Sequence, residues 1–492
     1  MKNTLSSRVP PLSSRAKSRD LLIEALLLLV IIILALALRL YKIDNPVADW
    51  HSFRQADTAS VTREYLKHGI NWLVPKYHDL SNIQSGRENP FGYRMVEFPV
   101  INGATAWLIQ TFRLQASEVL VGRLVSVFFS LVTIVSIFLL GRSVGGPPTG
   151  LIGALVFSIF PYSVYFSRTI LPEPALLAFS TLSLALFSIW LEKKNWPLYL
   201  SSLLSLTLAL LVKPYAIFLA PLFLVLCLVK RAKIREYFLA ILLIGLSGIP
   251  LALWRNWILR YPEGVPVSDW LYNKDNIRFK GAFFHWLFEV RLGILILGIA
   301  GILPLVLGIF KKDKFRPFYV GWAVCLFAYL SIFAGGNVQH DYYQFFLMPF
   351  IALAIGRGIF SLWELPQNYL GKKTIIFMVG GLTVYSLFVS WYNVRGYYQV
   401  NNWPIVEAGQ KADQILEKDA KVIAPYNGDT AFLFQTNRTG WPIGYYIDQK
   451  IKAGATAYVS VVYDDEARTL EKQYSTLAKT DHYLIIDLTH KK

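Results

Sequence analysis

Residues 21–38 read LLIEALLLLVIIILALAL, an apolar run interrupted by a single acidic residue. A helix that crosses a bilayer needs about 20 mostly apolar residues. The run follows a basic, Ser/Arg-rich tail at residues 1–20, so it predicts a first membrane helix with a cytoplasmic tail before it. A cleaved signal peptide is the alternative, because Ala35-Leu36-Ala37 resembles a cleavage site. The length of the run and its continuation through Tyr41 favour an uncleaved helix.

Apolar runs of similar length continue to residue 391, and the chain of 492 residues is 54% hydrophobic, too apolar for a soluble protein. We therefore expect a polytopic α-helical membrane protein with about 11 transmembrane helices in residues 21–391. After the first run, the crossings are expected near 119–141, 149–166, 174–191, 198–212, 215–229, 237–257, 290–310, 317–335, 342–362 and 374–391.

Lys/Arg clusters recur at every second connection between these runs. Connections rich in Lys and Arg face the cytoplasm. The pattern predicts a multi-pass protein of the cytoplasmic membrane with its N-terminus in the cytoplasm and its C-terminus outside. The formal net charge of +17 lies mostly in these connections and the first tail, so we expect no nucleic-acid partner. The two cysteines lie inside apolar runs, and no CxxC or Cys/His spacing predicts a metal site.

Two longer segments are expected outside the membrane. Residues 42–117 form a large first loop, in which the apolar stretch 98–112 is too short to cross and predicts an interfacial helix. Residues 392–492 alternate short buried strands with helices and predict a small extracytoplasmic α/β domain. Its strands are expected near 422–424, 457–462 and 483–488, and its helices near 406–417, 443–452 and 465–478.

The first loop carries two candidate groups of polar residues. Arg54 and Asp57 lie in HSFRQADT, just after the first helix, where an arginine can keep a nearby carboxylate ionised as a base. An ordinary solvated loop is the alternative. Glu97 precedes Phe98-Pro99, and there the alternative is a simple helix start in which the acid complements the helix dipole.

Three later outer segments carry further candidates. They are the turn 167–174 (SRTILPEP), the Lys-Pro break at 213–214, and 340–344 (HDYYQ). Each has a plain structural explanation: a helix start, a lysine that reaches the interface, or interfacial tyrosines. The candidate side chains are Arg168, Glu173, Lys213, His340, Tyr342 and Tyr343.

All of these groups are expected on the extracytoplasmic face, although they come from distant segments. Transporters place ionisable groups near the bilayer midplane, in broken helices. Here the middles of the apolar runs are almost free of charge, with Glu24 and Arg357 as exceptions. The pattern favours an enzyme that acts at the outer membrane surface.

The order of the motifs resembles that of a known family. It runs from an outer-loop Asp through E-x-P, S-R-x-x-x-P-[DE] and K-P to a late H-x-Y-Y. Roughly residues 20–390 are similar to the polyprenyl-phosphate-sugar-dependent glycosyltransferases of the GT-C fold. The bacterial branch of the protein O-mannosyltransferase family, with its aminoarabinose and Rgt-type lipopolysaccharide sugar transferases, is the nearest match.

The resemblance implies a role for each candidate. Asp57 matches the catalytic carboxylate of the first loop and would be the general base of an inverting transfer. Thr58 departs from the Asp-Glu found in many members, which removes a second carboxylate. Arg168, Lys213, Arg54 and His340 would bind the donor phosphate. Glu97, Glu173, Tyr342 and Tyr343 would orient the substrates.

The implied donor is a polyprenyl-phosphate sugar, held among membrane lipids, and the acceptor is a glycan, lipid or protein hydroxyl. No cofactor or metal is required, while a divalent metal stays open. Two other functions also stay open: a flippase or transporter of lipid-linked glycans, which would need charges within its helices, and an O-antigen polymerase or ligase, which would carry its large loop late in the chain.

Overall fold

The computed structural model describes residues 14–365 and 371–492, and it is mostly helical. Six of its helical segments are long and apolar enough to cross a membrane. Four shorter apolar helical segments accompany them. The expectation of a polytopic helical membrane protein is therefore confirmed. The six long segments are Arg19–Arg39, Glu118–Gly145, Glu173–Lys193, Ile234–Ile258, Asp341–Trp363 and Lys372–Ile415, and the shorter ones are Pro147–Ile159, Trp196–Val212, Pro214–Val229 and Arg316–Ile332.

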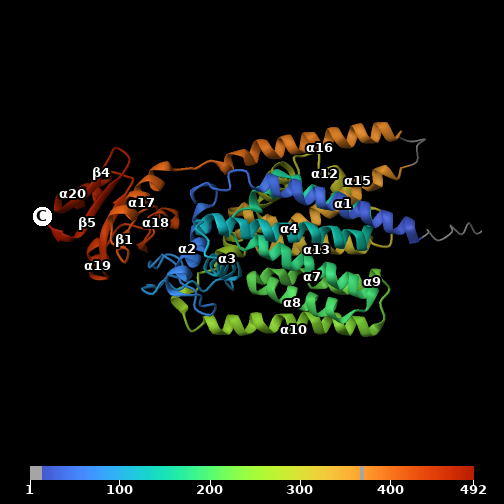
Figure 1. Cartoon of the computed structure of the whole chain (residues 1–492), viewed down its shortest axis with the longest axis horizontal. Helices are drawn as coiled ribbons and strands as arrows, with labels where there is room; N and C mark the ends of the chain where they lie inside the picture. The colour runs from blue at the N-terminus through green and yellow to red at the C-terminus, as the bar shows by residue number, and fades with distance from the viewer. Residues whose placement is uncertain (1–13, 366–370) are drawn as a thin grey trace, which may run out of the picture.

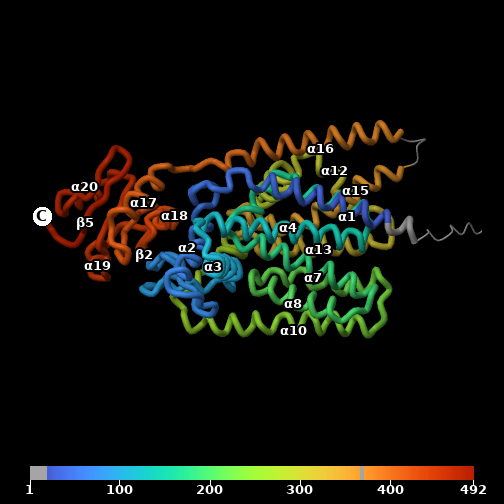
Figure 2. Tube along the Cα trace, viewed as in Figure 1, coloured from blue at the N-terminus to red at the C-terminus, as the bar shows by residue number. Residues whose placement is uncertain are grey.

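The helices form an elongated bundle, with α10 along one edge and α16 along the other (Figures 1 and 2). Apolar side chains pack the interior, and many others remain exposed on the outer helices, as expected for surfaces that face lipid. The helices of the bundle are α1 (Ser14–Arg39), α4 (Glu118–Gly145), α5 (Pro147–Ile159), α7 (Glu173–Lys193), α8 (Trp196–Val212), α9 (Pro221–Val229), α10 (Ile234–Ile258), α12 (Ile302–Phe310), α13 (Arg316–Ile332), α15 (Met348–Trp363) and α16 (Lys372–Val394).

Two expected crossings are broken in the structure. The helix expected over 149–166 is interrupted at Phe160, after which Pro161 starts the short helix α6 (Pro161–Phe166). Proline lacks a backbone N–H and interrupts helical hydrogen bonding. In the crossing expected over 290–310, a wide π-helical segment gives way to a turn at Gly298, whose φ is 54°. A Cβ there would lie 2.0 Å from the carbonyl oxygen of Ser386 in α16, so the turn lets two backbones approach closely.

The first loop contains two helices, α2 (Ser52–His68) and α3 (Val100–Phe112). The extended segment between them is held by isolated bridges, Lys76 to Tyr93 and Asp79 to Gly440. Both helices lie at the end of the bundle that faces the C-terminal part of the chain (Figure 1).

The C-terminal part is a mixed sheet of five strands in the order β2-β1-β3-β5-β4, with helices packed on it. β1 pairs in parallel with β2 and β3, while β5 pairs antiparallel with β3 and β4. The bounds are α17 (Trp403–Ile415), β1 (Lys421–Ile423), α18 (Thr430–Gln435), β2 (Thr439–Trp441), α19 (Ile447–Lys452), β3 (Ala455–Ser460), α20 (Asp465–Gln473), β4 (Tyr474–Lys479) and β5 (Leu484–Lys491).

The helix expected over 465–478 is wrong in its last five residues. It ends at Gln473, and Tyr474 starts strand β4. Tyr474-Ser475-Thr476 favours extended backbone, and pairing with β5 overrides the helical pattern before it.

Gly440 joins the C-terminal sheet to the first loop. Its N–H donates to the carbonyl oxygen of His78 at 2.9 Å, and its own carbonyl accepts from Leu80 at 2.8 Å. A Cβ at this position would lie 1.8 Å from the carbonyl oxygen of Val422. Only glycine fits between the loop and β1, and this close contact fixes how the sheet docks against the loop.

Candidate functional site

Helix α2 carries two charged residues of the predicted site on one buried face. Arg54 and Asp57 are three residues apart, a spacing that places side chains on the same side of a helix. The helix packs against α3 and against α18 of the C-terminal part. Asp57 is only 1% exposed, so its carboxylate depends on protein partners rather than on solvent.

Each oxygen of Asp57 has one such partner. Nη2 of Arg94 lies 2.7 Å from Oδ2, and the hydroxyl of Thr430 donates to Oδ1 at 2.7 Å. The N–H of Arg94 donates to the carbonyl oxygen of Pro75, and its guanidinium lies 5.0 Å from the centre of the Tyr77 ring. Thr430 is the first residue of α18, so the C-terminal part contributes directly to the surroundings of Asp57.

Arg54 forms an ion pair with Glu97, 43 residues later in the chain, with 2.5 Å between Nη2 and Oε1. Burial alone would raise the pKa of Glu97, but Arg54, Lys213 and Arg94 together lower it to about 2. Burial alone would lower the pKa of Arg54, but Glu97 raises it above its ordinary value. Both side chains are therefore charged at any physiological pH.

Lys213 occupies the break between α8 and the short helix η1 (Pro214–Leu219). Its Nζ lies 3.4 Å from Oε1 of Glu173, and the hydroxyl of Tyr215 donates to the same oxygen at 3.3 Å. Lys213 also helps to lower the pKa of Glu97, so the two ion pairs belong to one cluster. Arg54, Arg94 and Lys213 supply three positive charges, and Asp57, Glu97 and Glu173 supply three negative ones; we call these six residues the charged cluster.

Several buried polar atoms of the charged cluster lack a partner among the described residues. They are Oε2 of Glu97, Oε2 of Glu173 and Nε of Arg94. Buried polar atoms in folded proteins are nearly always hydrogen-bonded. Each of these atoms is a place where a polar ligand is expected to complete the bonding. A small cavity lined by Arg54, Asp57, Arg94 and Glu97 lies at two of the three residues; Glu173 does not line it.

His340 and the two tyrosines that follow stack beside this cluster. The Tyr342 and Tyr343 rings lie 4.7 Å apart at an interplanar angle of 25°, and the His340 ring lies 5.4 Å from that of Tyr342. Nζ of Lys213 lies 6.0 Å from the centre of the Tyr343 ring. Burial and the nearby His51 lower the pKa of His340 to about 4, so at neutral pH it offers an aromatic face and a hydrogen bond rather than a charge.

Asp341 is the centre of a second polar cluster. Nε2 of His51 lies 2.5 Å from its carboxylate, Nε1 of Trp50 lies 3.0 Å away, and Nη1 of Arg291 lies 3.1 Å away. The hydroxyl of Tyr397 also donates to it. This cluster ties the start of α2 to the segment that carries His340.

Arg168 is placed differently from the other predicted phosphate ligands. It is fully buried, and its Nη2 lies 2.9 Å from Oδ2 of Asp49. Nη2 of Arg123 lies 3.4 Å from the same oxygen. Nε2 of Gln55 donates to the other oxygen of Asp49 at 2.7 Å. Arg168 thus holds the beginning of the first loop against α4 and the turn after α6.

The chain is similar to proteins of known family and structure. Residues 104–254 match the family model described as dolichyl-phosphate-mannose-protein mannosyltransferase. ArnT from Cupriavidus metallidurans, solved bound to undecaprenyl phosphate, superposes with a TM-score of 0.65 at 15% identity, covering 93% of this chain and 97% of that one. The chain has the GT-C glycosyltransferase fold.

Other solved GT-C proteins are similar over most of this chain. The Archaeoglobus fulgidus oligosaccharyltransferase solved with Zn and sulfate gives a TM-score of 0.56 at 11% identity, covering 88% of this chain and 67% of that one. The oligosaccharyltransferase AglB from the same organism, solved with an inhibitory peptide and a dolichol-phosphate, gives 0.55 at 11% identity, covering 92% and 72%. A search of curated protein sequences found no significant match. The predicted resemblance to GT-C glycosyltransferases is confirmed for the fold.

Two residues of the site could not be found from the sequence. Arg94 follows Gly-Tyr in a loop with no repeating pattern, and Thr430 lies in a tail in which we recognised no motif. Neither position carries a signal in a single sequence, because both are brought to Asp57 by contacts between distant segments. Among the described residues, no group of three His, Cys, Asp or Glu side chains is placed to hold a metal ion.

Proposed function

We propose that this protein transfers a sugar from a polyprenyl-phosphate donor to an acceptor hydroxyl at the extracytoplasmic face of the cytoplasmic membrane. The observation that carries the proposal is the charged cluster, which pairs the buried carboxylate of Asp57 with Arg94 and groups it with two further ion-paired cations on a GT-C fold. The alternating basic connections support the orientation, with the first loop and the C-terminal part outside.

The cations of the charged cluster suit the donor phosphate. Two GT-C proteins of similar structure were solved with undecaprenyl phosphate and with a dolichol-phosphate. Lys213 is the best candidate for the first contact, because its ion pair with Glu173 is long at 3.4 Å and readily exchanged for a phosphate oxygen. Arg54 lies in the same cluster, and preorganised cations there would stabilise charge that develops on the leaving phosphate.

Asp57 is proposed as the general base. The acceptor oxygen attacks the anomeric carbon, the bond from that carbon to the phosphate oxygen breaks, and the hydroxyl proton passes to Asp57. The products are the glycosylated acceptor and the polyprenyl phosphate, and attack opposite the leaving group inverts the anomeric configuration. Arg94 and Thr430 each donate to one oxygen of Asp57, and a carboxylate oxygen retains a second lone pair for the acceptor proton.

The remaining predicted residues take supporting roles in this proposal. Glu97 and Glu173 hold Arg54 and Lys213 in place. Tyr342, Tyr343 and the neutral His340 present aromatic faces beside the phosphate position. Arg168 is assigned to positioning, because Asp49 already binds its guanidinium. The proposed chemistry runs on these side chains and requires no metal.

The test measures whether the purified protein releases or transfers the sugar from each member of a panel of polyprenyl-phosphate sugars. Wild type is compared with Asp57→Asn and with Asp44→Asn, which removes an exposed carboxylate from the same loop. We expect sugar release from at least one donor, lost in Asp57→Asn and kept in Asp44→Asn. Equal release by wild type and Asp57→Asn would contradict the base assignment. Donor movement across vesicle membranes without any release would instead favour a flippase.

A further inference from the structure

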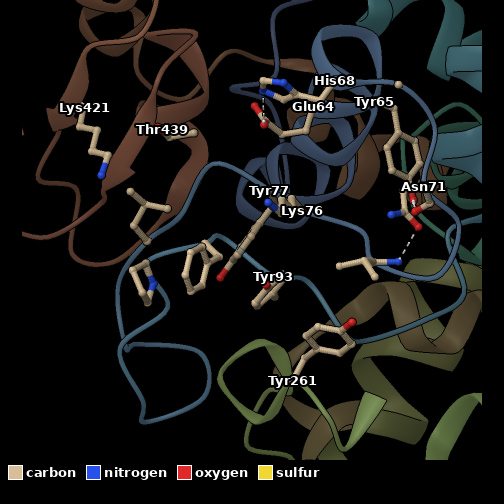
Figure 3. Close-up of a pocket in the computed structure, with 15 residues that line it drawn as sticks. Glu64, Tyr65, His68, Asn71, Lys76, Tyr77, Tyr93, Tyr261, Lys421 and Thr439 are labelled. Atoms are coloured by element: carbon tan, nitrogen blue, oxygen red, sulfur yellow. Dashed lines mark hydrogen bonds and ion pairs between the residues drawn. The ribbon is translucent and has the colours of Figure 1, made fainter. Parts of the chain in front are cut away.

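A cavity of about 510 Å³ lies between the first loop and the C-terminal part, beyond the end of α2. Figure 3 shows Glu64, His68 and Tyr65 of α2 along the top of it, Tyr77 and Tyr93 near its middle, Tyr261 below them, and Lys421 and Thr439 at the left. A second cavity of about 400 Å³ shares Leu80, Pro90 and Lys421 with the first. We call the two cavities together the seam.

The seam lies close to Asp57. Glu64 follows Asp57 by seven residues on α2, which places the two carboxylates on the same face of the helix and about 10.5 Å apart along its axis. Tyr93 and Arg94 are neighbours in an extended segment, where successive side chains point to opposite sides. Tyr93 lines the seam, while Arg94 contacts Asp57.

Glu64 supplies a buried and unsatisfied polar group in the seam. Its side chain is 9% exposed, and Oε1 has no hydrogen-bond partner among the described residues. Nε2 of His78 lies 3.5 Å from this oxygen, and Nζ of Lys67 lies 3.8 Å away, both beyond a good hydrogen bond. A ligand that carries hydroxyl groups would satisfy this carboxylate.

Two exposed tyrosines border the second cavity in an unfavourable backbone conformation. Tyr445 and Tyr446 have φ values of 62° and 51° and are 68% and 76% exposed. Glu466 accepts from the N–H of Tyr445 at 2.7 Å, and Nζ of Lys450 donates to the carbonyl oxygens of Gly444 and Tyr445. Left-handed backbone at residues other than glycine is held only where surrounding contacts enforce it, and it concentrates at functional sites.

The backbone that lines the seam is already paired. The N–H of Tyr77 donates to the carbonyl oxygen of Gly92 at 2.7 Å on one side of the segment, and Gly440 pairs with His78 and Leu80 on the other. An extended peptide that binds by strand addition needs an unpaired strand edge. Recognition in the seam must therefore come from aromatic rings and polar side chains, a combination that suits the apolar faces and hydroxyl edges of sugars.

We propose that the seam binds the sugar chain of a glycan acceptor, at sugars distant from the hydroxyl that reacts at Asp57. This inference rests on the proposed function and names its acceptor class. Tyr93 and Tyr261 stack on sugar faces in the first cavity, Glu64 accepts from sugar hydroxyls, and Tyr445 and Tyr446 extend the contact along the second cavity.

The test measures binding without transfer. The purified protein in detergent is incubated with short oligosaccharides released by chemical deacylation of envelope glycolipids from the source organism, and retained sugars are quantified by mass spectrometry. The variants are Tyr445→Gly/Tyr446→Gly, which removes both rings and relieves the backbone strain, and Tyr93→Ala. Trp403→Ala is the control, because Trp403 is an exposed aromatic of the C-terminal part that lines neither cavity.

We expect wild type, Trp403→Ala and Asp57→Asn to retain the same oligosaccharides. The tyrosine variants should retain about tenfold less, the loss expected from removing aromatic contacts. The glycine pair should unfold at the same temperature as wild type or higher, because glycine adopts the left-handed backbone freely.

Three results would overturn the inference: equal retention by wild type and both tyrosine variants, no retention by wild type, or retention of peptides from a digest of envelope proteins in place of sugars. Release of donor sugar in the same preparation reports on the proposed function separately. Release that depends on Asp57 without oligosaccharide retention overturns the seam alone. Retention without any release supports the seam and overturns the catalytic proposal.

Discussion

The two ends of α2 differ in how their carboxylates are partnered. At one end, both oxygens of Asp57 receive a hydrogen bond or ion pair within the charged cluster. At the other end, Glu64 lines the first cavity of the seam, and its Oε1 has no hydrogen-bond partner among the described residues, with His78 at 3.5 Å and Lys67 at 3.8 Å. A carboxylate held by fixed donors is suited to act on a reacting group, whereas a carboxylate with an unsatisfied oxygen beside a cavity is suited to bind a ligand. One helix thus separates proposed chemistry from proposed recognition.

Neutralising each carboxylate in turn tests most directly whether Asp57 and Glu64 have different roles. Asp57→Asn is expected to lower kcat about 10²- to 10⁴-fold, because it removes the proposed base. Glu64→Gln keeps the shape of the side chain and is expected to raise KM for the acceptor less than about tenfold, with little change in kcat. Steady-state kinetics with one donor and one acceptor measure both. A larger loss of kcat in Glu64→Gln than in Asp57→Asn would reverse the assignment of the two ends.

The next effect concerns donor binding in the charged cluster. Lys213→Ala is expected to weaken binding of polyprenyl phosphate about 10- to 100-fold, because a hydrogen bond to a charged group is worth about 1.5–3 kcal/mol. Lys233→Ala removes an exposed lysine that precedes α10 and serves as the control. Competition against a labelled lipid phosphate in detergent gives both affinities. Equal affinities in the two variants would leave Lys213 as an ion-pair partner of Glu173 only.

A smaller effect is expected from the C-terminal side of the cluster. Thr430→Val keeps the volume of the side chain but removes the donor to Asp57, so kcat should fall about fivefold for a hydrogen bond worth about 1 kcal/mol. Thr430→Ser keeps the hydroxyl and should restore kcat. A loss of kcat that Thr430→Ser does not restore would indicate that Thr430 acts only in packing.

The smallest expected effect is a pH-dependent change in stability at the contact between the first loop and the sheet. Burial, and to a smaller extent the charge of Asp57, raise the pKa of Asp79 to about 6 from an ordinary value of 3.8. The protonated form is favoured by the fold, so its contribution to stability is complete below about pH 4 and is lost as the pH rises through about 6. Asp79→Asn cannot ionise and should therefore raise the unfolding temperature by a few degrees at pH 8.

The same variant should behave like wild type at pH 4. Scanning fluorimetry in detergent at both pH values measures the difference, and a shift of equal size at both would show that ionisation of Asp79 has no part in it.

The helical part of the fold was predictable because lipid imposes a simple pattern. An apolar run such as residues 21–38 has few structural options in a bilayer. The interruptions at Pro161 and Gly298 were not predicted, because the apolar pattern continues through both. Proline is a local signal for the first break. The turn at Gly298 depends on the close approach of Ser386 in α16, which lies later in the chain. In the C-terminal part, the switch from α20 to β4 at Tyr474 depends on pairing with β5, which lies later in the chain.

Contacts within the site were predictable only between residues that are close together in the sequence. Arg54 and Asp57 share a helix face, so their proximity follows from their spacing. Their other partners come from far along the chain: Glu97 is 43 residues from Arg54, and Thr430 is 373 residues from Asp57. The motif around Arg168 located the turn correctly between two helices, but Asp49, which binds its guanidinium, is 119 residues away and carries no signal of its own. The roles assigned to these residues remain predictions.

The hydrogen bond from Thr430 to Asp57 has a consequence for how the protein is made. A ribosome completes α2 and every helix of the bundle before it reaches Thr430. A chain that stops after α16 therefore has Arg94 opposite Asp57 but lacks the second donor and the far wall of the seam. Under the proposed orientation, the last hundred or so residues must also be translocated before they can dock. Nascent and truncated chains in the membrane would then be poor catalysts. They would consume little of the lipid-linked sugar donor before synthesis of the chain is finished.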